Sequence, residues 1–515
     1  MGFDLLSGSF FYRLLGRILD GIEQSARQSR IVRIIQVIRL WAKSSFLVRI
    51  CTHIADAFGA SLRNSAIIGR LLKEDETGRY KERGLVFRGY TAILSLLRRI
   101  YRALRLDKLL RDSITQKTYI WATLAFLTIP ILPTMAVLGL VALSMGSLLL
   151  ALLQDQTRTL TYSAVNKYVW LYMLVYGLAT LVSVTFWGSL QIGLITVFFV
   201  GFYHVLVSGI ETKGQLRFLI GALAFAGAFV GLIGILQFLG FIGPGLGAAA
   251  WLDDEMFDWG LRVYSTLGNP NVLGTYFLLI IPLTFAGMFI SQTNQGRLYF
   301  LGTAGVMCLC LLLTLSRGAY LGILFVAATF CLLLDRRFLV PGILAAILLL
   351  LAMPEAILHR FFSIGDLADT STNYRVFIWL GTLEMLRDYW FSGIGPGEAA
   401  WALVYPAYAF ATIVTPHSHN LFLQITSDAG APGLVVFLCV IYQFFKTTFA
   451  TLRRTTGSQR ILTIAPISSV VAFLVMSMTD YTFYNFRVML FFWAILAVGI
   501  LATRYDKLRE GGEDT

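Results

Sequence analysis

A polar segment from Pro416 to Asn420 contains two of the five histidines in the chain, His417 and His419. A neutral imidazole near neutral pH can accept a proton from a hydroxyl group, so this pair is a candidate general base. Metal binding is disfavoured, because neither an HExxH pattern nor a cysteine partner accompanies the pair. The non-catalytic alternative is a pair of hydrogen-bonded loop histidines.

Three arginines, Arg262, Arg317 and Arg375, stand in short motif-like settings. Guanidinium groups bind phosphate oxygens in a bidentate manner. Arginines beside a general base therefore suit the attack of an acceptor hydroxyl on a carbon that carries a phosphate-type leaving group. Each arginine also has a simpler explanation. Arg317 can contact lipid head groups, Arg262 can balance the carboxylates of its own loop, and Arg375 can be a helix-surface charge.

The elements that must position these residues are membrane helices. The chain has 515 residues, of which 57% are hydrophobic and 14% charged, and its mean hydropathy is +0.72. Apolar runs of about 20 residues recur along it, which predicts an all-α, polytopic integral membrane protein. Four of the five cysteines lie within these runs, so we expect neither disulfides nor a metal site from them.

We predict about twelve membrane-spanning helices, with the first apolar segment folded as a hairpin around Pro130 and Pro133. Both ends of the chain are basic and are expected in the cytoplasm. The number of spans must then be even, which requires the first apolar segment to form a hairpin. The expected spans are 118–133, 134–153, 166–189, 190–209, 215–240, 271–290, 297–315, 318–334, 337–353, 431–449, 461–480 and 486–503.

The positive-inside rule also orients the loops. The basic loops fall on one side, and two long segments, 241–270 and 354–430, fall on the other. The second of these is a large helical extracytoplasmic loop between the ninth and tenth spans. It contains Arg375 and both histidines, and a long polar segment of this kind is usually functional. Arg262 and Arg317 are expected on the same side.

The first 117 residues form a separate basic region, with 22 Lys and Arg against 10 Asp and Glu. Since the rest of the chain is almost balanced, the net charge of +13 does not indicate a nucleic-acid-binding protein. Apolar residues recur at helical spacing beside arginines around residues 31–39 and 93–105. This pattern fits helices on an anionic membrane surface and, equally, a small cytosolic bundle. Residues 118–505 are then the transmembrane domain, and 506–515 a cytoplasmic tail.

Smaller signals concern the loops. Asn269, in Gly268-Asn269-Pro270-Asn271, is expected to cap the next helix, and Asn420 starts an apolar helix that returns toward the membrane. The glycine-rich segment 393–398 is a tight turn, without the context of a nucleotide-binding loop. Aromatic residues of the large loop can stack on sugar rings or anchor at the interface: Trp379, Trp390, Trp401, Tyr405 and Tyr408.

An ordered set of motifs resembles the O-antigen ligase and O-antigen polymerase superfamily, which comprises bacterial membrane glycosyltransferases that use polyprenyl-diphosphate-linked glycans. The resemblance covers roughly residues 118–505, and the basic N-terminal region lies outside it. Its motifs are Ser265-Thr266-Leu267-Gly268-Asn269-Pro270-Asn271, Leu315-Ser316-Arg317-Gly318, Arg375-Val376-Phe377-Ile378-Trp379, Gly393-Ile394-Gly395-Pro396-Gly397, His417-Ser418-His419-Asn420-Leu421-Phe422-Leu423-Gln424, and Gly430 with Gly433.

The resemblance implies a metal-independent transfer without a cofactor, on the outer face of the bacterial cytoplasmic (inner) membrane. It implies that His419 activates the acceptor hydroxyl and that Arg317 and Arg375 bind the diphosphate leaving group. A single displacement would invert the anomeric carbon. The secondary candidates for substrate binding are Arg262, His417, Asn420 and Asn269.

Several functions remain open at this stage. The acceptor can be a lipid A core, a growing glycan or a protein, so ligase and polymerase activities are not separated. Some relatives have been described as inorganic-carbon transporters, and a transporter needs charged or broken-helix sites near the bilayer midplane. Most of the expected spans have no such site, which favours the transferase. A non-catalytic scaffold would leave the outer histidines and arginines without a role.

Overall fold

The computed structural model describes residues 85–105, 117–155, 157–243, 262–334 and 370–509. These residues are almost entirely helical, and the only β interaction among them is an isolated bridge between Thr212 and Arg509. The chain divides into two compact units, Met1–Asp107 and Lys108–Thr515.

In the described part of the first unit, α7 (Leu85–Ala103) forms the helix expected from the apolar and basic stripes. Ile93, Leu96 and Ile100 on its apolar stripe are exposed, whereas Leu94 and Tyr101 are buried. The exposed stripe suits a membrane surface, which stays a prediction for this region. The similar pattern at residues 31–39 lies outside the described residues.

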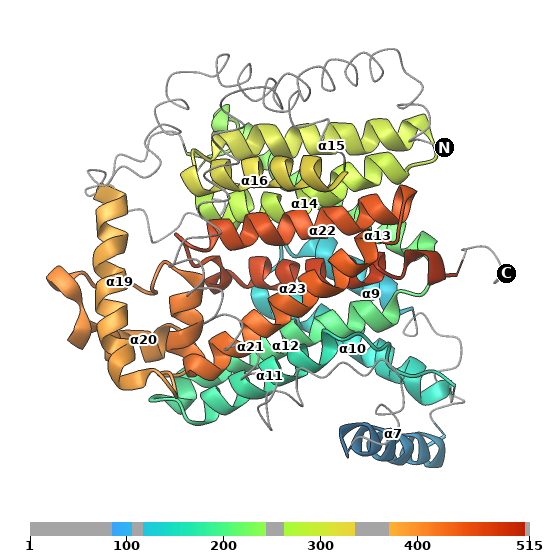
Figure 1. The fold of residues 1–515 in the computed structure, drawn as a ribbon, viewed down its shortest axis with the longest axis horizontal. Helices are drawn as coiled ribbons and strands as arrows, with labels where there is room; N and C mark the ends of the chain where they lie inside the picture. The colour runs from blue at the N-terminus through green and yellow to red at the C-terminus, as the bar shows by residue number, and fades with distance from the viewer. Residues whose placement is uncertain (1–84, 106–116, 156, 244–261, 335–369, 510–515) are drawn as a thin grey trace, which may run out of the picture. The chain divides into compact units, whose positions relative to one another are not determined.

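The second unit is a helical bundle (Figure 1). Among its described helices, eight are long and apolar enough to cross a membrane, and two shorter ones are also apolar. The all-α membrane fold is therefore confirmed, while the count of twelve stays a prediction and the expected span 337–353 lies outside the described residues. The bundle helices are α9 (Thr118–Thr128), α10 (Thr134–Gln154), α11 (Asn166–Leu181), α12 (Phe186–Gly209), α13 (Lys213–Phe238), α14 (Pro270–Ile290), α15 (Asn294–Leu313), α16 (Arg317–Leu334), α21 (Leu421–Leu452), α22 (Gly457–Met476) and α23 (Phe486–Ala502).

The predicted hairpin at the first apolar segment is present. The chain leaves α9 after Thr128 and enters α10 at Thr134, with Pro133 in an extended conformation at the helix start. Proline has no N–H for an intrahelical hydrogen bond, so it stands at a helix start but interrupts a continuous helix. The two helices pack against each other.

The centre of the bundle is α14. In its most apolar window 83% of the residues are buried, against 22% in α15 and in α16. It packs against α13, α15, α16, α22 and α23, and Figure 1 shows α15, α16 and α22 beside it. Close approach depends on small residues, since a Cβ atom at Gly274 would lie 2.6 Å from Ala319 Cβ. The start of α14 therefore occupies a fixed place among five helices.

The described part of the large loop is helical, as expected. It contains α19 (Thr370–Tyr389) and α20 (Glu398–Val404), followed by two short 3₁₀ turns. Trp401 and Tyr405 are buried and stacked, with ring centroids 4.6 Å apart. The Trp401 indole also donates a hydrogen bond to Thr415 O (2.6 Å). These two aromatic side chains therefore form the core of the loop and are not available for sugar stacking, while Trp390 is exposed.

The glycine-rich turn has a structural role. Gly393, Gly395 and Gly397 all have positive φ, and the turn packs against a break in α21 at Ala429 and Gly430. Ile394 N donates to Ser427 O (2.7 Å), Gly395 N donates to Asp428 O (3.2 Å), and Ala431 N donates to Trp390 O (2.7 Å). The backbone groups released by the break are thus satisfied by the loop.

Candidate active site

The His417–His419 segment is a tight turn rather than a strand or a helix. His419 has a φ of 48°, in the left-handed region, and its N–H donates to His417 Nδ1 (3.3 Å). The ring centroids lie 4.2 Å apart. This hydrogen bond requires His417 Nδ1 to be unprotonated, so the proton of a neutral His417 ring is on Nε2.

His417 is held neutral by its surroundings. Burial lowers its pKa well below the ordinary histidine value, and the charges of His419 and Arg375 act in the same direction, against the opposing charge of Asp480. The ring stacks on Tyr484 with a centroid distance of 4.9 Å. His417 therefore supports the turn, and His419 is the better candidate for proton transfer.

His419 is paired with a carboxylate from another part of the chain. His419 Nδ1 lies 3.4 Å from Asp480 Oδ1, and their side chains are 25% and 7% exposed. Nδ1 itself is buried, so the exposed edge of the ring is the one that includes Nε2. This geometry leaves one nitrogen toward Asp480 and the other toward the surface, as in histidine bases oriented by a carboxylate.

Asp480 is ionised at this position. Burial by itself would raise its pKa, but the neighbouring His419, Arg375 and His417 side chains hold that pKa below its usual range. Asp480 stands in the segment between α22 and α23, and Tyr481 N also donates to Asp480 Oδ1 (2.8 Å). The ionised carboxylate therefore lies directly beside the His419 ring.

Asn271, at the start of α14, connects Asp480 to two predicted motifs. Its Nδ2 donates to Asp480 Oδ2 (2.8 Å). Its Oδ1 accepts hydrogen bonds from Ser316 Oγ (2.8 Å) and from Arg262 Nη2 (3.3 Å). Arg262 also donates through Nε to Thr314 O (3.1 Å). Arg262 therefore stabilises the segment before α16 and is linked to the cluster by its hydrogen bond to Asn271.

Arg317 and Arg375 lie on two helices that reach this cluster. Arg317 is the first residue of α16, directly after Ser316, and Gly318 packs against Met476 and Thr479 at the end of α22. Arg375 lies in α19, and its charge lowers the pKa values of both His417 and Asp480. The three motifs that contain Arg317, Arg375 and His419 thus meet at one end of the bundle.

Asn269 and Asn420 are helix caps. Asn269 Oδ1 accepts from the backbone N–H groups of Asn271 and Val272 (2.8 and 3.3 Å), and Asn420 Oδ1 accepts from those of Phe422 and Leu423 (2.9 and 3.0 Å). The Asn420 amide also donates to Met478 O (2.8 Å). Their visible role is to orient the chain segments that carry Asn271 and His419.

A second series of hydrogen bonds supports the histidine turn. Ser418 N donates to Gln424 Oε1 (2.8 Å), and Gln424 Nε2 donates to Asp428 Oδ1 (2.9 Å). All three residues are buried. Because Asp428 fixes which end of the Gln424 amide faces the turn, it orients the turn without touching it.

Three of the six non-glycine residues with positive φ among the described residues lie in or beside these motifs. Ser265, Leu315 and His419 all have φ near 50° without being glycine. Each lies within or directly beside a motif noted in the sequence. Left-handed non-glycine residues persist only where the surrounding structure holds them, and they concentrate at functional sites.

Sequence reasoning missed Asp480 and gave Asn271 no chemical role. Asp480 is the only charged residue between α22 and α23, so a carboxylate at the junction of two apolar helices was the available signal. Its partner could not be identified from sequence, because the contact joins two separate connections between helices. The described residues contain no group of three or more His, Cys, Asp or Glu side chains arranged to hold a metal ion.

Comparison with protein families gives a match to the family described as O-antigen ligase, over residues 302–438. This range includes Arg317, Arg375, His417, His419 and Asn420. Comparison with curated proteins gives no match. The matched domain also agrees with the motif pattern and with the helical membrane fold. Residues 302–438 therefore carry an O-antigen ligase domain, which supports the resemblance to the O-antigen ligase and O-antigen polymerase superfamily.

Proposed function

We propose that this protein is a membrane glycosyltransferase that moves a glycan from a polyprenyl-diphosphate carrier to an acceptor hydroxyl, on the outer face of the bacterial cytoplasmic membrane. The family match supports enzymatic surface-polysaccharide assembly of the O-antigen-ligase kind. The observation that carries the proposal is the contact between His419 Nδ1 and Asp480 Oδ1 (3.4 Å), in a cluster reached by the Arg262, Arg317 and Arg375 segments.

In the proposed reaction, the acceptor oxygen attacks the anomeric carbon of the donor sugar. A new carbon–oxygen glycosidic bond forms, and the bond from that carbon to the diphosphate oxygen breaks with its electron pair on the diphosphate. His419 Nε2 takes the hydroxyl proton, and Asp480 stabilises the resulting imidazolium. The polyprenyl diphosphate leaves as an anion, and His419 returns its proton to solvent.

Arg317 and Arg375 are the proposed partners of the departing diphosphate, because negative charge grows there in the transition state. Arg262 is a weaker candidate for this task, since two of its donors are already used by Thr314 and Asn271. We assign it, with Asn269 and Asn420, to holding the site. A single displacement inverts the anomeric centre, and the product's anomeric configuration tests this point directly.

The main alternative is polymerase activity of the same superfamily, with a growing glycan as the acceptor. The transport alternative draws on the break in α21 beside Asp428, since broken helices line transporter sites. Here the backbone groups at the break are bonded to the glycine-rich turn, so the break is filled by protein. This arrangement favours the transferase.

The test is reconstitution of the full chain in liposomes with a polyprenyl-diphosphate-linked glycan and separate acceptors: a lipid A core, a glycan and a protein. The expected result is release of polyprenyl diphosphate together with one glycosylated acceptor. The variant His419→Ala should make no product at an unchanged protein level. Glycan movement across the bilayer without release of the carrier would instead support transport. A product chain that lengthens on itself would identify a polymerase.

A further inference from the structure

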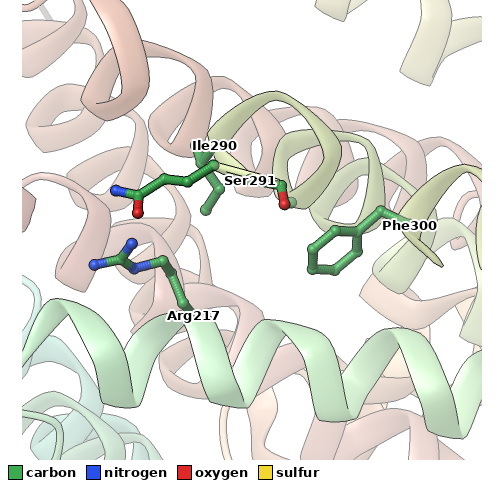
Figure 2. Close-up of a pocket in the computed structure, with 6 residues that line it drawn as sticks. Arg217, Ile290, Ser291 and Phe300 are labelled. Carbon is green, nitrogen blue, oxygen red and sulfur yellow. The ribbon is translucent and has the colours of Figure 1, made fainter. Parts of the chain in front are cut away.

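A small pocket lies at the end of α14 that is far from the candidate active site. It is lined by residues from α13, from the end of α14 and from α15: Arg217, Gly287, Ile290, Ser291, Gln292 and Phe300. Figure 2 shows the Arg217 side chain rising from α13, with Ile290 and Ser291 above it and the Phe300 ring on the far side. Asn271, which contacts Asp480, is near the opposite end of α14. A helix of this length spans about 30 Å, so the pocket and the histidine turn are separate sites.

The pocket combines one positive charge with polar and apolar walls. Arg217 Nε donates to Lys213 O (3.4 Å), which turns the rest of the guanidinium group toward the pocket. None of the ion pairs among the described residues includes Arg217. The nearest carboxylate in sequence, Glu211, is paired with Arg158 at 2.5 Å. The Arg217 charge is therefore available to an anion.

The size of the pocket limits the ligand. Its volume is about 200 Å³, below the range of roughly 300 to 1,000 Å³ for pockets that enclose a drug-sized molecule. A nucleotide or an oligosaccharide does not fit within it, whereas a phosphate group with a few attached atoms does. Gly287 allows the Phe300 ring to close one wall, since a Cβ atom there would lie 2.5 Å from the ring.

The neighbours of the pocket are apolar residues on the outside of the bundle. Phe218, next to Arg217, is 56% exposed, and Leu298 and Leu301, beside Phe300, are 70% and 53% exposed. In helices that cross a bilayer, exposed apolar side chains contact acyl chains. The pocket thus lies next to a surface that suits lipid tails, which separates a lipid ligand from a free phosphate ion.

We propose that this pocket binds the head group of an anionic phospholipid. The phosphate contacts the Arg217 guanidinium group, Ser291 and Gln292 contact the glycerol or head-group oxygens, and the acyl chains lie over Phe218 and Leu301. The basic loops at this end of the bundle are those that the positive-inside rule assigns to the cytoplasm, where the leaflet carries negative charge. Basic pockets between helices on this side suit acidic lipid head groups.

The experiment is native mass spectrometry of the full chain released from nanodiscs that contain equal amounts of phosphatidylglycerol and phosphatidylcholine. The wild type should retain phosphatidylglycerol in preference to phosphatidylcholine. Arg217→Gln should reduce this retention at least fivefold, and Arg217→Lys should restore part of it. The matched control is Arg297→Gln, which removes an arginine of the same end that bonds Asn294 instead of lining the pocket, and it should retain the lipid as the wild type does.

A second variant distinguishes a loss of lipid binding from a loss of folding. Gln292 is exposed, so Gln292→Glu should leave the thermal unfolding temperature unchanged while its added carboxylate repels the phosphate and lowers retention. Equal retention of the two lipids by the wild type, or unchanged retention in both Arg217→Gln and Gln292→Glu, would overturn the proposal. Displacement of the lipid by millimolar inorganic phosphate would also overturn it, in favour of a free-anion site. None of these readouts depends on glycan transfer.

Discussion

His419 and Asp480 face each other across 3.4 Å, from the Nδ1 of one to the Oδ1 of the other. His419 directly precedes the cap of α21, and Asp480 lies between α22 and α23. The link is reinforced from a third helix by Asn271, which binds the second carboxylate oxygen. A histidine whose ring is oriented by an ionised carboxylate and exposed on its other edge has the arrangement of a general base.

The first prediction concerns Asp480. Asp480→Asn should preserve the size of the side chain and remove the charge that stabilises the His419 imidazolium. General-base catalysis contributes about 10² to 10⁴ in rate, so the turnover number should fall by about 10- to 1,000-fold with a smaller change in KM. The measurement is steady-state transfer in liposomes. Asp506→Asn, in the C-terminal segment, is a matched control that should keep wild-type turnover. A turnover number within twofold of the wild type in Asp480→Asn would remove the pair from the mechanism.

The second prediction concerns Gln424, which holds the histidine turn. Gln424→Leu leaves the buried Ser418 N–H without its acceptor, at a cost of about 1–3 kcal/mol. We expect a lower thermal unfolding temperature and a fall in turnover number that exceeds any rise in KM. Gln424→Glu keeps an acceptor for Ser418 but loses the donor to Asp428 and brings two buried carboxyl groups together, so it should also lower the unfolding temperature. The control is Gln459→Leu, near the start of α22 and far from Asp480. It should lower stability without this selective loss of turnover.

The third prediction tests the break in α21. Gly430 has a φ of 64°, and a Cβ atom there would lie 1.8 Å from Phe391 O, a contact that no rotamer change relieves. Gly430→Ala should therefore displace the glycine-rich turn and strongly reduce the yield of folded protein, as measured by size-exclusion chromatography in detergent. Gly221→Ala, in a helix with no atom within 4 Å of the added carbon, should fold normally. Wild-type yield of Gly430→Ala would contradict the packing described for this turn.

The fourth prediction uses the lowered pKa of His417, which is caused first by burial. A histidine in the unfolded chain has the ordinary pKa of about 6.5. Below that pH the unfolded state binds a proton that the folded state does not, so stability falls as the pH decreases. The limiting slope is about 1.4 kcal/mol per pH unit for one group.

The measurement is the thermal unfolding temperature in detergent between pH 7.5 and 5.5. The wild type should lose stability over this window, and His417→Asn should show a weaker dependence because the titrating group is absent. The groups around His417 that contribute charge are His419, Asp480 and Arg375. Parallel curves for the two proteins would show that His417 is not the source of the acid sensitivity.

The fifth prediction concerns which side of the membrane carries the site. Val414 is 61% exposed and precedes the histidine turn. In a chain without its native cysteines, Val414→Cys should react with a membrane-impermeant thiol reagent added outside intact spheroplasts. Gln295→Cys, at the exposed start of α15, should react only after permeabilisation. The opposite pattern would reverse the proposed orientation.

The sequence alone was sufficient for the helical membrane fold, the hairpin broken by proline and the glycine-rich turn of the large loop. Each of these follows from local chemistry: a run of apolar residues long enough to cross a bilayer, the missing N–H of proline, or the conformations open to glycine. Asn269 and Asn420 were also recognisable as helix starts, because capping is decided within a few residues. The same local motifs brought His419, Arg317 and Arg375 to attention.

Only the tertiary structure decided which of these residues belong together. Asp480 gains its partner because α22 ends beside the start of α21. Asn271 joins Asp480 to Ser316 because α14 is packed among five helices. Sequence spacing carries no information about such contacts, since they join connections between different helices. Packing likewise turned Trp401 and Tyr405 from candidate sugar contacts into core residues, because their burial depends on α19 and the turns around them.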